Sequence, residues 1–170
     1  MLRRTLLPFL LAVVVILSPG CGRTKGVEMP FETIDKGMGA GKRERYESKE
    51  PGLVIIASLR DFALLEDDVP RLAQKLKDID YDHFCVVAVF QGHKPTGAYE
   101  VEIQRIRRQD DVVTIYARFA TPEPGQERTL VETSPYHLVK IRKGEDMRGQ
   151  FEFVLNVDGK EVVRKTHFIP

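Results

Sequence analysis

Residues 84–90 read FCVVAVF, an uninterrupted apolar run that is rich in valine. The run is too short for a typical helix, and β-branched residues favour extended backbone. Because no position in it is polar, neither face of the resulting strand would meet water. We therefore predict a central strand over 84–90 that is covered on both sides.

The segments that follow this run alternate between apolar and polar residues. Residues 99–104 read YEVEIQ and residues 113–119 read VTIYARF, which is the pattern of strands with one buried face. Further strands are predicted over 137–141, 151–157 and 162–169, with a hairpin turn at Asp158-Gly159. We expect one side of a single core to contain Val86, Ala88, Phe90, Tyr99, Val101, Ile103, Val113, Ile115 and Phe119.

Helices are predicted before the central strand rather than between the later strands. A β-branched run over 53–57 predicts a strand, and Ser58 with Asp61 has the pattern of a helix N-terminal cap. Apolar residues then recur at spacings of three and four from Val69 to Ile79, as on one face of a helix. The predicted fold class is therefore α+β, mainly an antiparallel β sheet or sandwich with one or two helices before the main run of strands.

The chain has 170 residues, which is enough for one domain, and 42% of them are hydrophobic, which is enough for a buried core. Its net charge of +1 gives no reason to expect a nucleic-acid partner. We predict a signal peptide over 1–20, a glycine-rich, charged spacer over 21–52 and a domain over 53–170. Within the spacer, Met29–Ile34 has the pattern of an edge strand.

The first residues have the pattern of an export signal that ends at a lipid-modified cysteine. Arg3 and Arg4 precede the apolar segment 6–17, which is shorter than the about 20 residues of a membrane-spanning helix. Ser18-Pro19-Gly20-Cys21 follows and is similar to the lipobox of bacterial lipoproteins, although Ser18 replaces the usual leucine. We therefore expect Cys21 to be lipidated, with chains such as palmitate, and to anchor the protein on the extracytoplasmic side of a membrane. Ordinary secretion and an uncleaved anchor are the alternatives.

The sequence has no arrangement of side chains that is typical of catalysis or metal binding. His83, Cys85, His93 and His137 lack the spacing of known metal ligands, and no serine lies in a G-x-S-x-G nucleophile elbow. We therefore expect no enzymatic activity, no metal and no other cofactor. Cys85 is interpreted as a small buried residue of the central strand.

Two loops carry the residues that we expect to bind a partner. Residues 91–100 read QGHKPTGAYE, in which Pro95 fixes one backbone dihedral and Gly97 is expected to adopt a positive φ. If the strands run antiparallel in chain order, this loop and the long connection 120–136 lie at the same end. The candidate binding residues are His93, Lys94, Pro95, Thr96, Gly97, Tyr99, Pro135 and Tyr136.

These loops also carry a family resemblance. The buried strand is followed by Gly92-x-Lys94-Pro95-Thr96-Gly97-x-Tyr99, then by Pro122-x-Pro124-Gly125 and by Thr133-x-Pro135-Tyr136-x-Leu138-Val139. Over residues 86–141 this pattern resembles the C-terminal domain of the PrcB family. The family usually shows Thr-Gly-Gly-Tyr, whereas this chain has Ala98 at the second glycine.

The resemblance implies a small exported bacterial protein, because members are often lipoproteins and the founding member is named as a subunit that stabilises a surface protease complex. We therefore expect a lipid-anchored, non-catalytic domain that binds a protein of the cell envelope, such as a protease. A second hypothesis is a chagasin-like protease inhibitor that acts through residues 93–99, because residues 94–99 are similar to the Asn-Pro-Thr-Thr-Gly-Tyr loop of those inhibitors. A purely structural envelope protein is a third hypothesis.

Overall fold

The computed structural model of the chain describes residues 26–40, 46–68, 70–125 and 129–170. The predicted signal peptide over 1–20 and the predicted lipidation site Cys21 lie outside these residues. In chain order the elements are β1 (Val27–Glu28), β2 (Phe31–Gly37), β3 (Gly52–Ile56), α1 (Leu59–Asp68), α2 (Pro70–Gln74), β4 (Phe84–Phe90), β5 (Glu100–Gln109), β6 (Val112–Ala120), β7 (Tyr136–Arg142), β8 (Gly149–Val157) and β9 (Lys160–Ile169).

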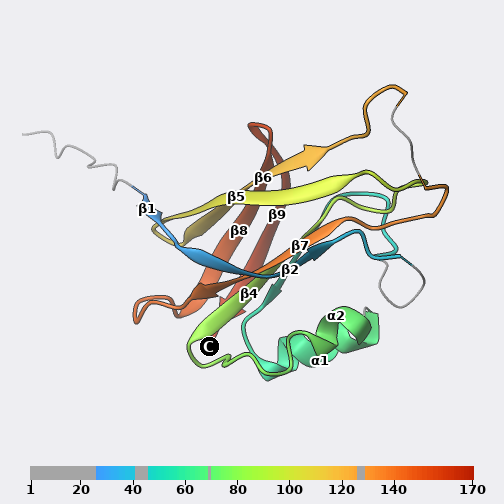
Figure 1. The fold of residues 1–170 in the computed structure, drawn as a ribbon. Helices are drawn as coiled ribbons and strands as arrows, with labels where there is room; N and C mark the ends of the chain where they lie inside the picture. The colour runs from blue at the N-terminus through green and yellow to red at the C-terminus, as the bar shows by residue number, and fades with distance from the viewer. Residues whose placement is uncertain (1–25, 41–45, 69, 126–128) are drawn as a thin grey trace, which may run out of the picture.

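The strands form two sheets that pack against each other as a sandwich (Figure 1). One sheet has five strands in the order β1-β5-β6-β8-β9, and the other has four in the order β2-β7-β4-β3. Neighbouring strands are antiparallel except for β6 and β8, which run parallel. The predicted α+β class, with a mainly antiparallel sandwich, is confirmed, whereas the parallel pair was not predicted.

Strand β4 is buried on both faces, as its apolar sequence predicts. Cys85, Val87 and Val89 lie between the two sheets, and the alternate residues Val86 and Phe90 lie on the side of the helices. The expectation of a single core was therefore wrong. The inter-sheet core contains Val101, Ile103, Val113 and Ile115 with Phe119 packed against it, but Val86, Ala88 and Phe90 belong to a second cluster. Tyr99 is partly exposed and belongs to neither. An all-apolar strand does not specify which alternate set faces which layer.

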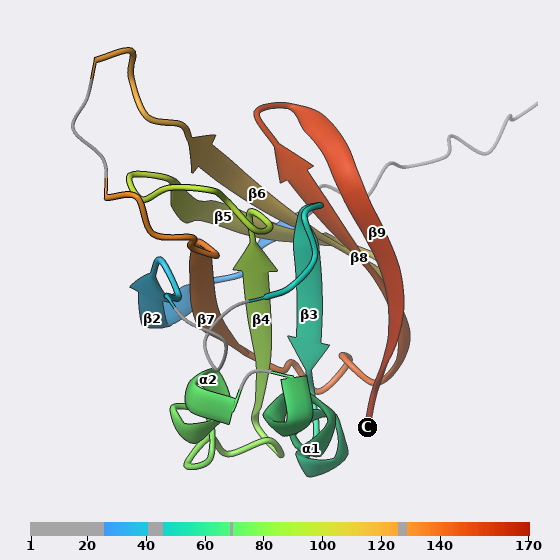
Figure 2. The same ribbon diagram turned by 90° about the vertical axis from the view of Figure 1, so that its right-hand side faces the viewer.

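Helices α1 and α2 cover the outer face of the four-stranded sheet (Figure 2). The predicted cap of α1 is confirmed, because the Asp61 amide donates to Ser58 Oγ at 3.2 Å while Asp61 Oδ2 accepts from the Ala57 amide at 2.9 Å. Leu72 and Leu76 are 1% and 0% exposed against this sheet. The fold therefore has three layers, two sheets and one pair of short helices.

Strands β1 and β2 come from the segment that was predicted as a spacer. β2 pairs with β7 at the edge of the four-stranded sheet, and β1 pairs with β5 at the edge of the five-stranded sheet. Only Met29 and Pro30 separate the two strands, so one short connection joins the two sheets along this side. The folded part of the chain consequently includes β1 and β2, with the predicted edge strand lying at a sheet edge.

The turn between β8 and β9 has the geometry that its sequence predicts. Asp158 and Gly159 both have positive φ, at 51° and 85°. Two consecutive residues with positive φ form the type I′ turn that matches the twist of antiparallel strands.

Candidate functional site

The two loops with the family motif meet at one end of the sandwich. Residues 91–99 lead from β4 to β5, and residues 121–135 lead from β6 back to β7, so both connections cross between the sheets. The Lys94 amide donates to the Thr133 carbonyl at 2.8 Å, and the Thr133 amide donates back to Lys94 at 2.9 Å. The predicted approach of the two loops is therefore observed, but it arises from two crossings between sheets instead of turns within one sheet.

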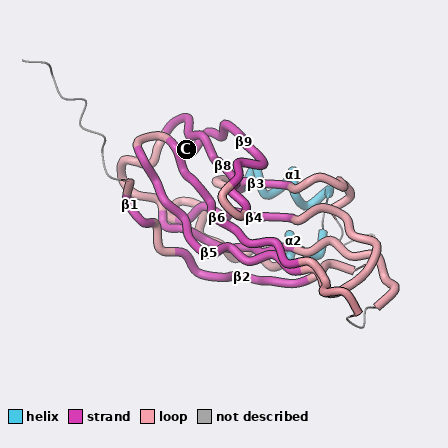
Figure 3. Tube along the Cα trace, turned by 90° about the horizontal axis from the view of Figure 1, so that it is seen from above, coloured by secondary structure: helices cyan, strands magenta, loops and turns pink. Residues whose placement is uncertain are grey.

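We call this region the loop end and define it as residues 36–40, 91–99 and 129–136. Figures 1 and 3 show it at the opposite end of the strands from β1. The third segment takes part through the Ser134 amide, which donates to the Met38 carbonyl at 2.7 Å. Several chain segments thus hold one another in place through backbone hydrogen bonds.

Backbone conformation at the loop end explains part of the sequence motif. Positive φ values occur at Gly39 (43°), Gly92 (86°) and Ala98 (69°) but not at Gly97, so the expectation of a positive φ at Gly97 was wrong. Gly97 is constrained by space instead, since a Cβ atom there would lie 2.4 Å from Thr129 Oγ1. Ala98 stands where the resembling family usually has glycine, and its left-handed backbone gives a physical reason for that glycine.

The candidate residues divide into an accessible and a buried group. Pro95 is exposed, and Lys94 and Tyr99 are partly exposed, with Lys94 Nζ 5.7 Å from the centre of the Tyr99 ring. His93 and Thr96 are also partly exposed. In contrast, Gly97, Pro135 and Tyr136 are buried.

Tyr136, which was expected at the surface, is part of the core under the loops. It is 6% exposed, its ring lies 6.3 Å from that of Phe90, and its hydroxyl donates to Asp35 Oδ2 at 2.5 Å. Burial opposes ionisation of Asp35, but hydrogen bonds from Lys75 and Tyr136 outweigh it and lower the pKa of that carboxyl. The aromatic residue of the second motif therefore supports the loop end from below.

Apolar side chains at the loop end form the surface that the sequence analysis missed. Met38, Leu130 and Val131 are 44%, 90% and 50% exposed. Met38 and Thr129 also line a pocket of about 490 Å³ next to Tyr99. The signal in the sequence was the apolar pair Leu130-Val131 inside an otherwise polar connection.

Cys85 and the histidines form no common metal site in the part of the chain that the structure describes. No three His, Cys, Asp or Glu side chains among the described residues are grouped so as to hold a metal ion. Burial raises the pKa of the Cys85 thiol to about 12, which keeps it protonated, and Cys85 is 0% exposed. His83 Nδ1 lies within hydrogen-bonding distance of Asp80 Oδ2, at 2.7 Å, at the end of β4 opposite the loop end.

Taken together, the sandwich and its loop end define a small β domain that exposes large apolar side chains at one end. A family model described as PrcB C-terminal matches residues 85–142, the segment from β4 to β7 that includes both loops, and the predicted family resemblance is thereby confirmed. No curated protein and no solved structure matches the chain. None of the described helices is long and apolar enough to cross a membrane.

Proposed function

We propose that this protein is a lipid-anchored, extracytoplasmic domain that binds a protein of the cell envelope through its loop end and has no catalytic activity. The observation that carries the proposal is the exposure of Met38, Leu130 and Val131 at 44%, 90% and 50%. Large apolar side chains that are exposed in one region are typical of protein–protein contact sites. The lipid anchor is supported by the sequence around Cys21.

The hydrogen bonds within the loop end also support a binding function. The Gly97 amide donates to the Thr129 carbonyl at 3.0 Å, and Thr133 Oγ1 donates to the Thr96 carbonyl at 2.9 Å. Loops that are ordered before association lose less conformational entropy when a partner docks. The match to the PrcB C-terminal model favours a partner in an envelope complex, such as a protease.

The geometry favours this function over inhibition of a protease by residues 93–99. An inhibitory loop has to project freely into the protease cleft. Here Gly97 is buried, and Thr96 is tied through its carbonyl to Thr133. We expect the purified protein to leave the activity of a panel of cysteine and serine proteases unchanged. Stoichiometric inhibition would instead support the chagasin-like hypothesis.

Site-specific photo-crosslinking in growing cells tests the proposed binding surface. A photoreactive amino acid at Leu130 or Val131 should give a discrete adduct with one envelope protein. Phe168 is a matched control, since it is an apolar residue with 62% exposure on β9 and lies away from the loop end. Equal adducts at Leu130 and Phe168, or no protein adduct at Leu130, would contradict the proposed function.

A further inference from the structure

The end of the sandwich opposite the loop end has its own pockets and its own chain segment leading to Cys21. We define this anchor end as residues 26–30, 108–111 and 142–148. We propose that the anchor end faces the phospholipid bilayer and that the loop end is held away from it. This inference rests on the proposed lipid anchor at Cys21 and adds an orientation and a membrane-contact surface to it.

The first argument is the short distance in sequence between the predicted lipid and the fold. Cys21 precedes Gly26 by five residues, and an extended chain spans about 3.5 Å per residue, so the two lie at most about 18 Å apart. Val27 pairs with Arg108, next to the turn between β5 and β6. A lipid on Cys21 therefore holds the anchor end at the membrane surface.

The loop end lies beyond the reach of that tether. β5 runs from the loop end to the anchor end and contains 10 residues. At about 3.4 Å per residue it separates the two ends by about 30 Å. An end-on orientation thus presents Leu130 and Val131 to proteins that extend well above the bilayer.

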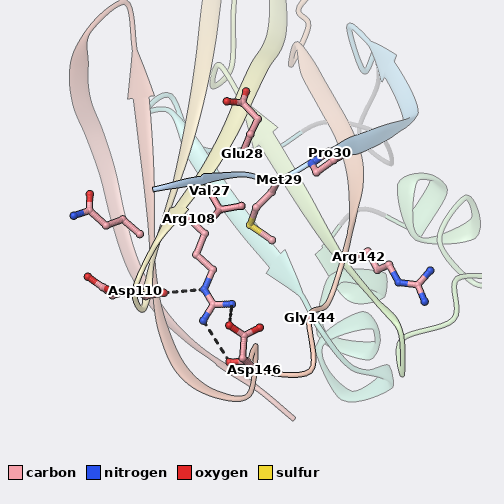
Figure 4. A pocket seen from close by; sticks show the side chains of 10 residues that line it. Val27, Glu28, Met29, Pro30, Arg108, Asp110, Arg142, Gly144 and Asp146 are labelled. Atoms are coloured by element: carbon pink, nitrogen blue, oxygen red, sulfur yellow. Dashed lines mark hydrogen bonds and ion pairs between the residues drawn. The ribbon is translucent and has the colours of Figure 1, made fainter. Parts of the chain in front are cut away.

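The second argument is the chemistry of the anchor end. A pocket of about 630 Å³ is lined by Val27, Met29 and Pro30, with Val27 69% exposed (Figure 4). Arg108 stands beside them and forms an ion pair with Asp146 at 2.9 Å. The lining also includes the charged residues Glu28 and Arg142, and apolar side chains next to charged ones suit the boundary between headgroups and acyl chains.

A second, polar pocket at this end offers cationic groups for phosphate headgroups. It has a volume of about 640 Å³ and includes Arg142 and Arg148, together with the acidic residues Asp82 and Glu145. Both arginine side chains are exposed, and no described residue forms an ion pair with either guanidinium. Arg142 lines both pockets, so the apolar side chains and the two arginines are adjacent. Guanidinium groups bind phosphate in a bidentate manner and snorkel at membrane interfaces.

Fluorescence quenching on vesicles tests this orientation. The full-length lipidated protein is reconstituted into vesicles of phosphatidylethanolamine and phosphatidylglycerol that contain a headgroup-linked quencher. Single cysteines for an environment-sensitive dye replace Val27 or the exposed Gln109 at the anchor end, Lys165 in the middle of β9, or Pro95 at the loop end. Native Cys85 does not interfere, because it is 0% exposed and its pKa is raised to about 12 by burial.

We expect quenching at positions 27 and 109 to be at least three times that at position 95, with an intermediate value at position 165. Equal quenching at all positions would mean free tumbling on the tether, and equal quenching at 27 and 165 would mean a domain lying on its side. Either result overturns the orientation while vesicle flotation still supports the anchor. Protein that fails to float with vesicles contradicts the anchor and the orientation together.

Two variants test whether the short tether and the two arginines cause the orientation. A flexible insertion of about 20 residues before Gly26 lengthens the tether and should reduce quenching at position 27 to the level at position 165. Arg142→Glu with Arg148→Glu should also reduce it on these anionic vesicles. Arg118→Glu, an exposed charge on β6, is the matched control and should leave it unchanged. Identical quenching in the double variant and the control would overturn the assignment of the two arginines.

Discussion

The backbone amide of Ile103 in β5 donates a hydrogen bond of 2.9 Å to Nδ1 of His137 in β7. The other ring nitrogen, Nε2, lies 2.9 Å from Thr33 Oγ1 in β2. One imidazole therefore links strand β5 of the five-stranded sheet to two strands of the other sheet, β7 and β2. Because Nδ1 accepts a hydrogen bond from an amide, the proton of the neutral ring is on Nε2, which donates to Thr33.

This link predicts a loss of stability in mild acid. Burial, followed by the charge of Lys36, lowers the pKa of His137 below its ordinary value of 6.5. As the pH falls below about 6.5, the unfolded chain takes up a proton that the folded chain resists, so the free energy of unfolding decreases. Denaturant titrations between pH 8 and 5 should show this contribution present above pH 6.5 and progressively lost below it.

The His137→Gln variant serves as the control for that titration. Its amide oxygen is an acceptor for the Ile103 amide but does not titrate in this range, so the decrease toward acid should be smaller than in the wild type. His137→Ala should instead cost about 1–3 kcal/mol at pH 8, because it leaves a buried amide unpaired. An unchanged pH profile in His137→Gln would contradict this role of the imidazole.

Among the aromatic residues under the loop end, Phe90 is predicted to contribute most to the free energy of unfolding. It is 0% exposed and stacks on Tyr46 with 4.6 Å between the ring centres. Phe90→Ala should lower the free energy of unfolding by about 3–5 kcal/mol in urea titrations. Phe168→Ala is the matched control, since Phe168 is 62% exposed and its loss should cost less than about 0.5 kcal/mol.

The left-handed backbone at Ala98 predicts a stabilising substitution. Its φ of 69° places Cβ close to the following carbonyl, at a cost of about 1–2 kcal/mol. Glycine at position 98 removes that cost, but it also raises the conformational entropy of the unfolded chain, which opposes folding. Ala98→Gly should therefore increase the free energy of unfolding by about 0.5–1 kcal/mol. The measurement is a rise in Tm of about 1–4 °C. A fall in Tm would show that the Ala98 methyl group makes a compensating contact.

Replacement of Gly92 by alanine should lower the stability of the domain. Gly92 has a φ of 86°, and a Cβ atom there would lie 2.3 Å from the Lys49 carbonyl oxygen. Because the obstacle is backbone, Gly92→Ala has to displace the segment around Lys49. We expect a cost above 2 kcal/mol, on the order of other substitutions that combine strain with a clash. Gly125→Ala is the control with positive φ but no atom within 4 Å of the added Cβ, and it should cost less.

Local patterns in the sequence predicted local structure well, and they failed where pairing depends on distant segments. The cap at Ser58 and Asp61 and the turn at Asp158 and Gly159 follow from adjacent residues, and both are observed. The parallel pairing of β6 with β8 could not be predicted from local sequence. The alternation of apolar and polar residues shows which face of a strand is buried, but it does not show which strand lies beside it. The same limit applies to β4, whose apolar residues fit either layer.

The candidate site shows a similar division. The loop 91–99 and the connection before β7 could be predicted to meet, because the order of antiparallel strands places their ends. The depth of a side chain could not be predicted, so Tyr136 was expected at the surface but is 6% exposed. Met38 was missed for the opposite reason, because it reaches the loop end only through the unforeseen pairing of β2 with β7.

If Cys21 carries the lipid, substitution of this residue should change where the protein is found in the cell but not how it folds. Cys21→Ser removes the thiol that would carry the lipid, so the protein should lose fatty-acid labelling and either stay uncleaved or leave the membrane fraction. Cys85→Ser is the control, because Cys85 is buried in β4 and should leave labelling intact. Normal labelling of Cys21→Ser would contradict the predicted anchor.

Substitutions at the loop end should separate binding from stability. Leu130 is 90% exposed, so Leu130→Asp should abolish recovery of the crosslinked partner while changing Tm by less than about 2 °C. Lys94→Glu should weaken recovery with an equally small change in Tm. Tyr136→Ala should lower Tm by more than about 6 °C, because it empties a buried site and removes the hydroxyl that donates to Asp35. If Leu130→Asp unfolds the domain, the apolar loop residues are part of its architecture. If it folds and still retains the partner, binding occurs elsewhere on the sandwich.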